Sequence, residues 1–174
     1  MLSGLYIYTS SDPYSSSTNL TNIRNAFVNT LQNTYNGRIA ILLSQRPLGG
    51  GMSNGIGGFC NTYPAYPGPQ CITTGLSSSL SPFPNYSYST YIIAHELGHV
   101  MGLRHTHACV WNGNYTQIDD CGNVLATQGG YTAEGASCYV STSPLIPTNG
   151  NIMSQCNEVA GSSVNLSLGF GTLP

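Results

Sequence analysis

Residues 95–105 read HELGHVMGLRH and follow the apolar residues of a predicted helix over 90–101. His95 and His99 are four residues apart, so their side chains leave the same helix face one turn apart. Two imidazoles placed in this way can hold one Zn²⁺ ion. Glu96 can then reach a water molecule at the metal. The segment therefore predicts a metal-binding helix that carries its own acidic group.

The motif continues past the end of this helix. Gly102 is placed to stop the helix, and a glycine lets the backbone turn sharply. His105 can then return toward the metal as a third ligand. The full pattern is HExxHxxGxxH, and it uses three of the four histidines in the chain.

Length and charge limit the classes of protein. The chain has 174 residues, which suits one domain (1–174) that we divide at Gly102 into an upper lobe (1–102) and a lower lobe (103–174). Only four residues are Lys or Arg, which argues against nucleic-acid binding and a polybasic membrane patch. The longest apolar run, Ile39–Leu43, is far short of the roughly 20 residues of a membrane span. We expect a monomer.

The remaining patterns predict an α+β fold. Apolar residues recur at helical spacing from Thr18 to Tyr35, with Thr18 or Asn19 as the cap and Gly37 as the stop. Four short segments are predicted as strands: 5–9, 39–43, 55–63 and 71–74. After Gly102 the sequence predicts irregular structure held by disulfides.

Six cysteines form an even set without a CxxC pair. In a chain with few charges and many Ser, Thr and Asn residues, they predict three disulfides and an extracytoplasmic location. Cys60 and Cys71 flank one short proline-rich loop and are the expected pair. The alternative is six buried thiols in a cytosolic protein. No signal peptide is visible, so a secreted chain would be a mature form or part of a longer precursor.

HELGHVMGLRH resembles the zinc-binding segment of the metzincin metalloendopeptidases, and Asn151-Ile152-Met153-Ser154 is similar to their Met-turn. Within that superfamily the chain is most similar to secreted bacterial adamalysin (reprolysin)-like enzymes. Gly57, Gly58 and Phe59 resemble the edge strand above the active site in that family. Thr106, directly after the third histidine, is more like the pappalysins, so the subfamily stays open.

The resemblance implies a metzincin fold, with a mixed twisted sheet and the active-site helix in the upper lobe, and an irregular disulfide-rich lower lobe. It implies a secreted zinc endopeptidase whose substrates are proteins or peptides. Glu96 would be the general base, and Met153 would lie beneath the metal. The family pattern begins with a further strand and a long helix, so these elements are either removed by truncation or absent from a reduced fold.

Rival interpretations remain. A secreted adhesion module with a structural zinc would not need Glu96, and a zinc hydrolase could act on a non-peptide amide. Asp119 and Asp120 form either a calcium site or a solvated turn. His107 is expected at the surface, beside the metal ligands or in place of His105, and Trp111 fits packing better than recognition.

Overall fold

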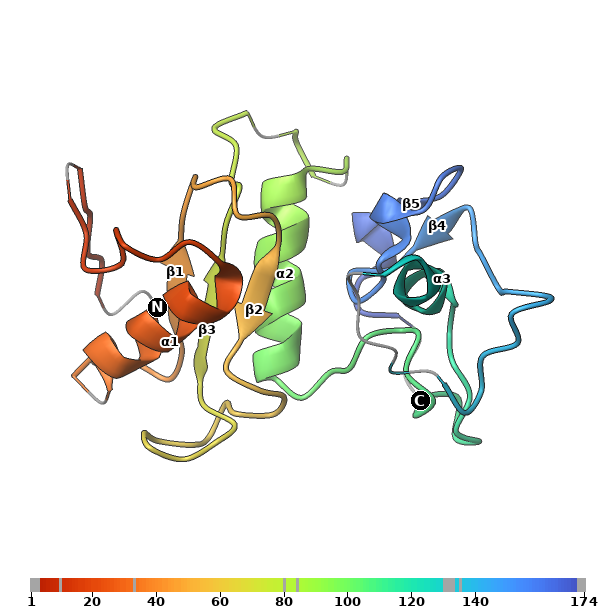
Figure 1. The fold of residues 1–174 in the computed structure, drawn as a ribbon, viewed down its shortest axis with the longest axis horizontal. Coiled ribbons are helices and arrows are strands. Elements are labelled where there is room, and N and C mark those ends of the chain that lie inside the picture. The colour runs from red at the N-terminus through yellow and green to blue at the C-terminus, as the bar shows by residue number, and fades with distance from the viewer. Residues whose placement is uncertain are drawn as a thin grey trace. The chain divides into compact units, whose positions relative to one another are not determined.

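The computed structural model describes residues 4–9, 11–32, 34–79, 81–83, 85–129, 134 and 136–171. The chain forms two compact units, shown in Figure 1. The first unit comprises Met1–Leu80 and Tyr88–Leu103, and the second comprises Ser81–Ser87 and Arg104–Pro174. Helices and small mixed sheets make this an α+β protein. The assignment of these units to one catalytic domain stays a prediction.

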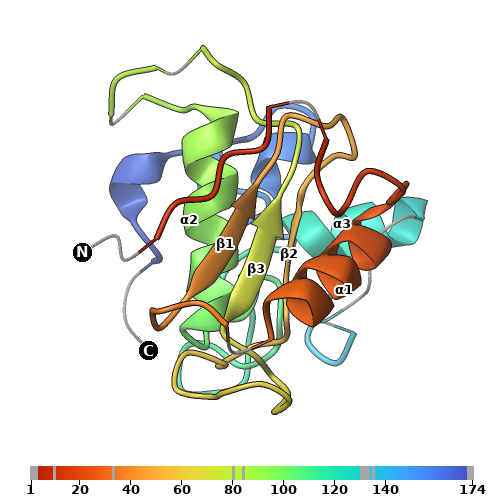
Figure 2. The same ribbon diagram turned by 90° about the vertical axis from the view of Figure 1, so that its left-hand side faces the viewer.

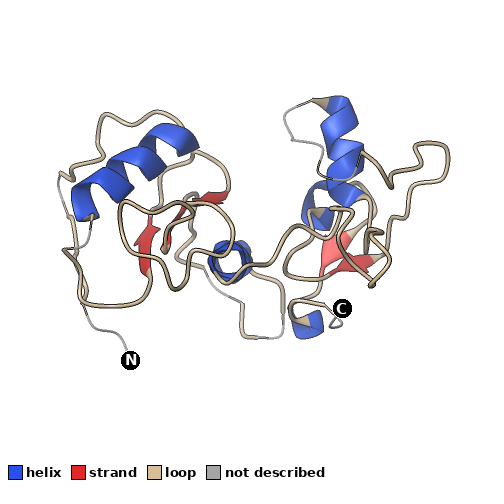
Figure 3. Ribbon diagram, turned by 90° about the horizontal axis from the view of Figure 1, so that it is seen from below, coloured by secondary structure: helices blue, strands red, loops and turns tan. Residues whose placement is uncertain are grey.

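The first unit contains a three-stranded sheet in the order β1-β3-β2. β1 (Ala40–Leu43) runs parallel to β3 (Gln70–Thr73), whereas β2 (Gly51–Ser53) runs antiparallel to it. Helices α1 and α2 cover opposite faces of this sheet, as Figures 2 and 3 show. β1 and β3 confirm the strands expected at 39–43 and 71–74.

Helix α1 (Leu20–Leu31) follows the predicted apolar spacing. Asn19 caps it by accepting a hydrogen bond from the Asn22 N–H over 2.9 Å, which satisfies one of the donors exposed at a helix start. Ile23 and Phe27 are buried and pack with Tyr14 and Ile72 in the core between α1 and the sheet. The helix ends before Gly37.

Helix α2 (Tyr88–Val100) confirms the predicted helix that carries the motif. Gly102 has a φ of 107°, a conformation that favours glycine, and it ends the helix as expected. No helix among the described residues is long and apolar enough to cross a membrane.

The edge strand lies earlier than predicted. Positive φ angles of 88° at Gly55 and 83° at Gly57 are incompatible with a strand, so the expectation of a strand over 55–63 is wrong. Gly57 and Phe59 instead donate hydrogen bonds to the carbonyls of His99 and Val100, over 2.9 and 3.1 Å. The His99 carbonyl also accepts from the Gly102 N–H over 3.0 Å, and the Gly57–Phe59 segment adds further donors for the last carbonyls of the helix.

One further expectation is wrong, and another is confirmed in part. Residues 5–8 form no strand, and their large side chains are mostly exposed. The second unit is mostly irregular and holds disulfides, as expected, but it also contains α3 (Cys121–Gln128). It also holds a parallel pair of short strands, β4 (Asn149–Gly150) and β5 (Ser163–Val164), and two 3-10 turns, Cys156–Glu158 and Leu166–Leu168.

Two disulfides occur among the described residues, Cys109–Cys138 and Cys121–Cys156. Cys60 and Cys71 are free thiols, so the predicted third disulfide and its pairing are wrong. Cys71 lies in β3 and its side chain is fully buried, whereas Cys60 is exposed. Closeness in sequence therefore did not bring the two sulfurs together.

Candidate metal centre

His95 and His99 are brought together on one face of α2. Their ring centroids lie 4.8 Å apart and the rings meet edge to face. Both side chains are buried, and the Tyr91 ring packs against His95 at a centroid distance of 5.4 Å. A helical turn thus sets the spacing between the two imidazoles, as the sequence predicts.

The bend after α2 orients the His99 ring. The Leu103 carbonyl lies 2.7 Å from His99 Nδ1, and the Leu103 N–H donates to the Gly98 carbonyl over 2.9 Å. The carbonyl can only accept, so His99 carries its proton on Nδ1 and presents Nε2 as a lone pair. This is the arrangement that metal-binding histidines use.

Glu96 lies against the α2-facing side of the sheet. A Cβ atom at Gly51 would stand 2.5 Å from Glu96 Cγ, so only glycine leaves room for this side chain. Burial raises the pKa of the Glu96 carboxyl to about 8, and a hydrogen bond from the Ser53 backbone opposes that rise. Glu96 Oε2 is buried and has no hydrogen-bond partner among the described residues. A buried oxygen without a partner is costly and often marks a catalytic or water-binding site.

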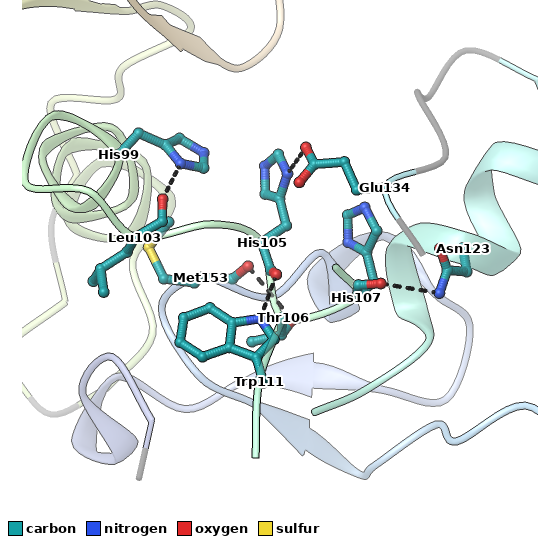
Figure 4. A network of polar contacts seen from close by, with 9 residues as sticks. All are labelled: His99, Leu103, His105, Thr106, His107, Trp111, Asn123, Glu134 and Met153. Carbon is teal, nitrogen blue, oxygen red and sulfur yellow. Dashed lines mark hydrogen bonds and ion pairs between the residues drawn. The ribbon is translucent and has the colours of Figure 1, made fainter. Parts of the chain in front are cut away.

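His105 belongs to the second unit, where three contacts place it (Figure 4). Its carbonyl accepts a hydrogen bond from Trp111 Nε1 over 2.8 Å. Its Nδ1 lies 2.7 Å from Glu134 Oε1. The next residue, Thr106, donates its N–H to the Met153 carbonyl over 3.2 Å. Trp111 therefore has the packing role that we expected, together with a structural hydrogen bond.

Met153 lies in a tight turn and is fully buried. Its N–H donates to Asn151 Oδ1 over 2.8 Å, and the Ser154 N–H donates to the Asn151 carbonyl over 3.1 Å. Gly150 leaves space for this turn, because a Cβ atom there would stand 2.3 Å from Ser154 Oγ. Through the hydrogen bond from the Thr106 N–H to the Met153 carbonyl, this turn is linked to the residue that follows His105.

His107 is buried, which excludes the surface position considered from the sequence. Its ring stacks on that of His105 at a centroid distance of 5.0 Å. It also packs on α3, where a Cβ atom at Gly122 would stand 2.1 Å from His107 Nδ1. His105, His107 and Glu134 offer ligand atoms within 4.8 Å of one another.

Asp119 and Asp120 do not form a solvated turn. Both are buried, and the Asp120 carboxylate accepts hydrogen bonds from Gln117 Nε2, Asn123 Nδ2 and the Leu145 N–H. Burial raises the pKa of Asp119. The pair therefore stabilises the loops around α3, and calcium binding stays untested.

The residues present fit a zinc ion. The Nδ1 atoms of His99 and His105 are engaged by a carbonyl and a carboxylate, which leaves Nε2 for a metal. One buried oxygen of Glu96 has no hydrogen-bond partner in the described part of the chain. The structure brings His95, Glu96 and His99 together on α2, whereas His105 and Met153 belong to the other unit. A three-histidine site therefore stays a prediction.

Sequence reasoning missed three contributors. Glu134 meets His105 across 29 positions of the chain, and no local pattern marks such a contact. Leu103 acts through its backbone carbonyl, which its side chain does not reveal. Gly51 lies in a run of three glycines, and the run itself was the only available signal.

Comparison with known families gives one match. The model of metallo-peptidase family M12 (Reprolysin_5) matches residues 1–167, which is nearly the whole chain. Searches of curated proteins and of solved structures find no match.

Proposed function

The chain belongs to metallo-peptidase family M12, and from this premise we propose that it is a secreted zinc endopeptidase acting on extracellular proteins. The observation that carries the proposal is Glu96 between His95 and His99 on α2, with a buried carboxyl oxygen that has no hydrogen-bond partner within the ranges that the structure describes. A peptidase acts on proteins or peptides, so the substrate class follows from the family.

His95, His99 and His105 would hold the metal through their imidazoles. Zinc in such a site supplies Lewis-acid chemistry, since it polarises a carbonyl and makes water a stronger acid. The Leu103 carbonyl accepts a hydrogen bond from His99 Nδ1 and so leaves Nε2 for the metal. This bond would orient the His99 ring before substrate binds.

Burial favours the neutral form of Glu96, whereas a Zn²⁺ ion held by the neighbouring histidines would favour the ionised carboxylate. In that ionised form Glu96 would act as the general base. Its carboxylate accepts a proton from the attacking water and passes it to the departing amine of the peptide. The Ser53 N–H bonds the carboxyl from β2, and Gly51 leaves it the room that it occupies. A base held in this way needs little rearrangement to reach the water.

The outer edge of β2 is the proposed binding site for an extended substrate segment. β2 is the last strand in the order β1-β3-β2, so its second edge has no partner strand in this sheet. A peptide can add to such an edge through main-chain hydrogen bonds. Gly57, Gly58 and Phe59, proposed for this role from the resemblance, lie outside β2, and Gly57 and Phe59 donate hydrogen bonds to the last turn of α2. Their contact with substrate stays a prediction.

Two disulfides in the second unit support secretion, because disulfides persist mainly in oxidising compartments. We propose a monomer.

The experiment is peptide cleavage before and after removal of the metal. Dialysis of the purified protein against 1,10-phenanthroline should abolish cleavage, and about one equivalent of Zn²⁺ should restore it. Mg²⁺ at the same concentration is the control and should restore nothing. Full activity in the metal-free protein would contradict the proposal.

A further inference from the structure

We propose that Glu134 is a positioning residue for the third zinc ligand: its carboxylate holds the His105 ring so that Nε2 faces the metal. This inference rests on the proposed function. Glu134 lies outside the HExxHxxGxxH motif, 29 residues after His105 in the sequence.

The contact is a short hydrogen bond of 2.7 Å between His105 Nδ1 and Glu134 Oε1. Figure 4 shows the carboxylate beside that nitrogen. A carboxylate accepts hydrogen bonds, so this pairing places the imidazole proton on Nδ1. The opposite nitrogen, Nε2, then carries the lone pair that a metal requires. A carboxylate partner also makes the imidazole a stronger donor to the metal.

Two further contacts fix the backbone of His105. Trp111 Nε1 bonds the His105 carbonyl, and the Met153 carbonyl accepts the N–H of Thr106. Both bonds act on the main chain and do not bond the imidazole ring. His107 stacks on one face of the ring and limits its tilt. Glu134 bonds a ring nitrogen and therefore defines the rotation.

The same cluster offers a rival arrangement. Ligand atoms of His105, His107 and Glu134 lie within 4.8 Å of one another, so Glu134 could itself hold a second metal ion. That arrangement requires His105 Nδ1 to lose the proton that it shares with the carboxylate. The hydrogen-bond length favours the proton, and the two arrangements differ in zinc stoichiometry.

The test compares the zinc affinity of the full chain with that of Glu134→Ala and Glu134→Gln, measured by competition with a chromophoric chelator. Glu134→Ala should bind zinc about 10–100-fold more weakly, the usual cost of losing such a partner. Glu134→Gln keeps an acceptor oxygen without the charge, so its loss should be smaller. Glu158→Gln changes an exposed acid of the same unit and should match the wild type.

Cobalt substitution separates an effect on the metal ligands from a general loss of stability, because a purely structural role of Glu134 would leave the cobalt spectrum unchanged. The d–d absorption of Co²⁺ reports ligand geometry, so Glu134→Ala should shift the band and Glu134→Gln should largely restore it. If Glu134→Ala fails to fold, Glu134→Met replaces it: this variant keeps the length of the side chain but offers no acceptor oxygen, so it should lose the same zinc affinity relative to Glu158→Gln.

Two results would overturn the proposal. One is unchanged zinc affinity and cobalt spectrum in both Glu134 variants. The other is two zinc ions in the wild type and one in Glu134→Ala, which would make Glu134 a ligand. Wild-type protein that binds zinc but cleaves no peptide would contradict the endopeptidase proposal alone, because the affinity comparison does not depend on cleavage.

Discussion

Replacing Gly51 with alanine tests whether the sheet positions the proposed general base. The new Cβ atom would stand 2.5 Å from Glu96 Cγ, 2.8 Å from Glu96 Oε1 and 2.7 Å from the Ile72 carbonyl oxygen. Carbon atoms do not approach this closely, so a neighbour must move. Ile72 is held in β3 by the ladder, whereas Glu96 is a side chain. Displacement of Glu96 relieves two of these contacts, and the contact with the Ile72 carbonyl requires β2 to shift as well, so Glu96 should leave its present position.

The expected magnitude has two parts. Overpacking of a buried site costs about 1–3 kcal/mol of the free energy of unfolding. At this chain length each kcal/mol lowers the melting temperature by about 2–4 °C. Displacing a catalytic group by about 1 Å can cost about 10² in rate, so kcat/KM should fall by about that factor. Zinc content should not change, because the three atoms nearest to the new Cβ belong to Glu96 and Ile72 and none to a proposed ligand.

The assay is peptide hydrolysis at a temperature well below the melting point of the variant, with bound zinc measured in the same samples. Gly4→Ala is a matched control, because the nearest atom to its new Cβ would stand 3.8 Å away, an ordinary contact. Wild-type rate and melting temperature in Gly51→Ala would refute the reasoning. Loss of zinc together with activity would also refute it, since the effect would then reach the ligands.

Two further predictions concern the cysteines. In the native protein, iodoacetamide should label the exposed Cys60 and leave the buried Cys71 unlabelled. After denaturant is added, both thiols should react. If mass spectrometry finds no free thiol, a third disulfide is present and the prediction is wrong. Replacing Cys121 and Cys156 with serine should lower the free energy of unfolding by about 2–5 kcal/mol, measured by urea denaturation, because this disulfide joins residues 35 positions apart in the second unit. Cys60→Ser is the control. Equal stability of the two variants would contradict the stabilising role of the disulfide.

The sequence predicted the elements whose pattern is local. Apolar spacing located α1 and α2, and Asn19 and Gly102 marked an end of each. A continuous apolar run located β1. In each case the signal lies within the element itself, so no knowledge of its neighbours was needed.

The missed features depend on contacts between distant segments. β2 has only three residues and begins with Gly51. Gly51 matters because the absence of a side chain leaves room for Glu96. Cys60 and Cys71 are close in sequence, but one side chain is exposed and the other enclosed by the core. Glu134 meets His105 only through the fold of the second unit. Side-chain periodicity carries no information about such pairs.

The most direct test of the central claim is peptide hydrolysis by the wild type and by Glu96→Ala at equal zinc content. The account predicts that the variant keeps its zinc, because the histidines are untouched. Its rate should fall by about 10²–10⁴, because the acceptor for the proton of the attacking water is gone. A zinc-loaded variant that cleaves peptides at the wild-type rate would contradict the mechanism. A wild type that binds zinc and cleaves nothing would instead favour a binding module with a structural metal.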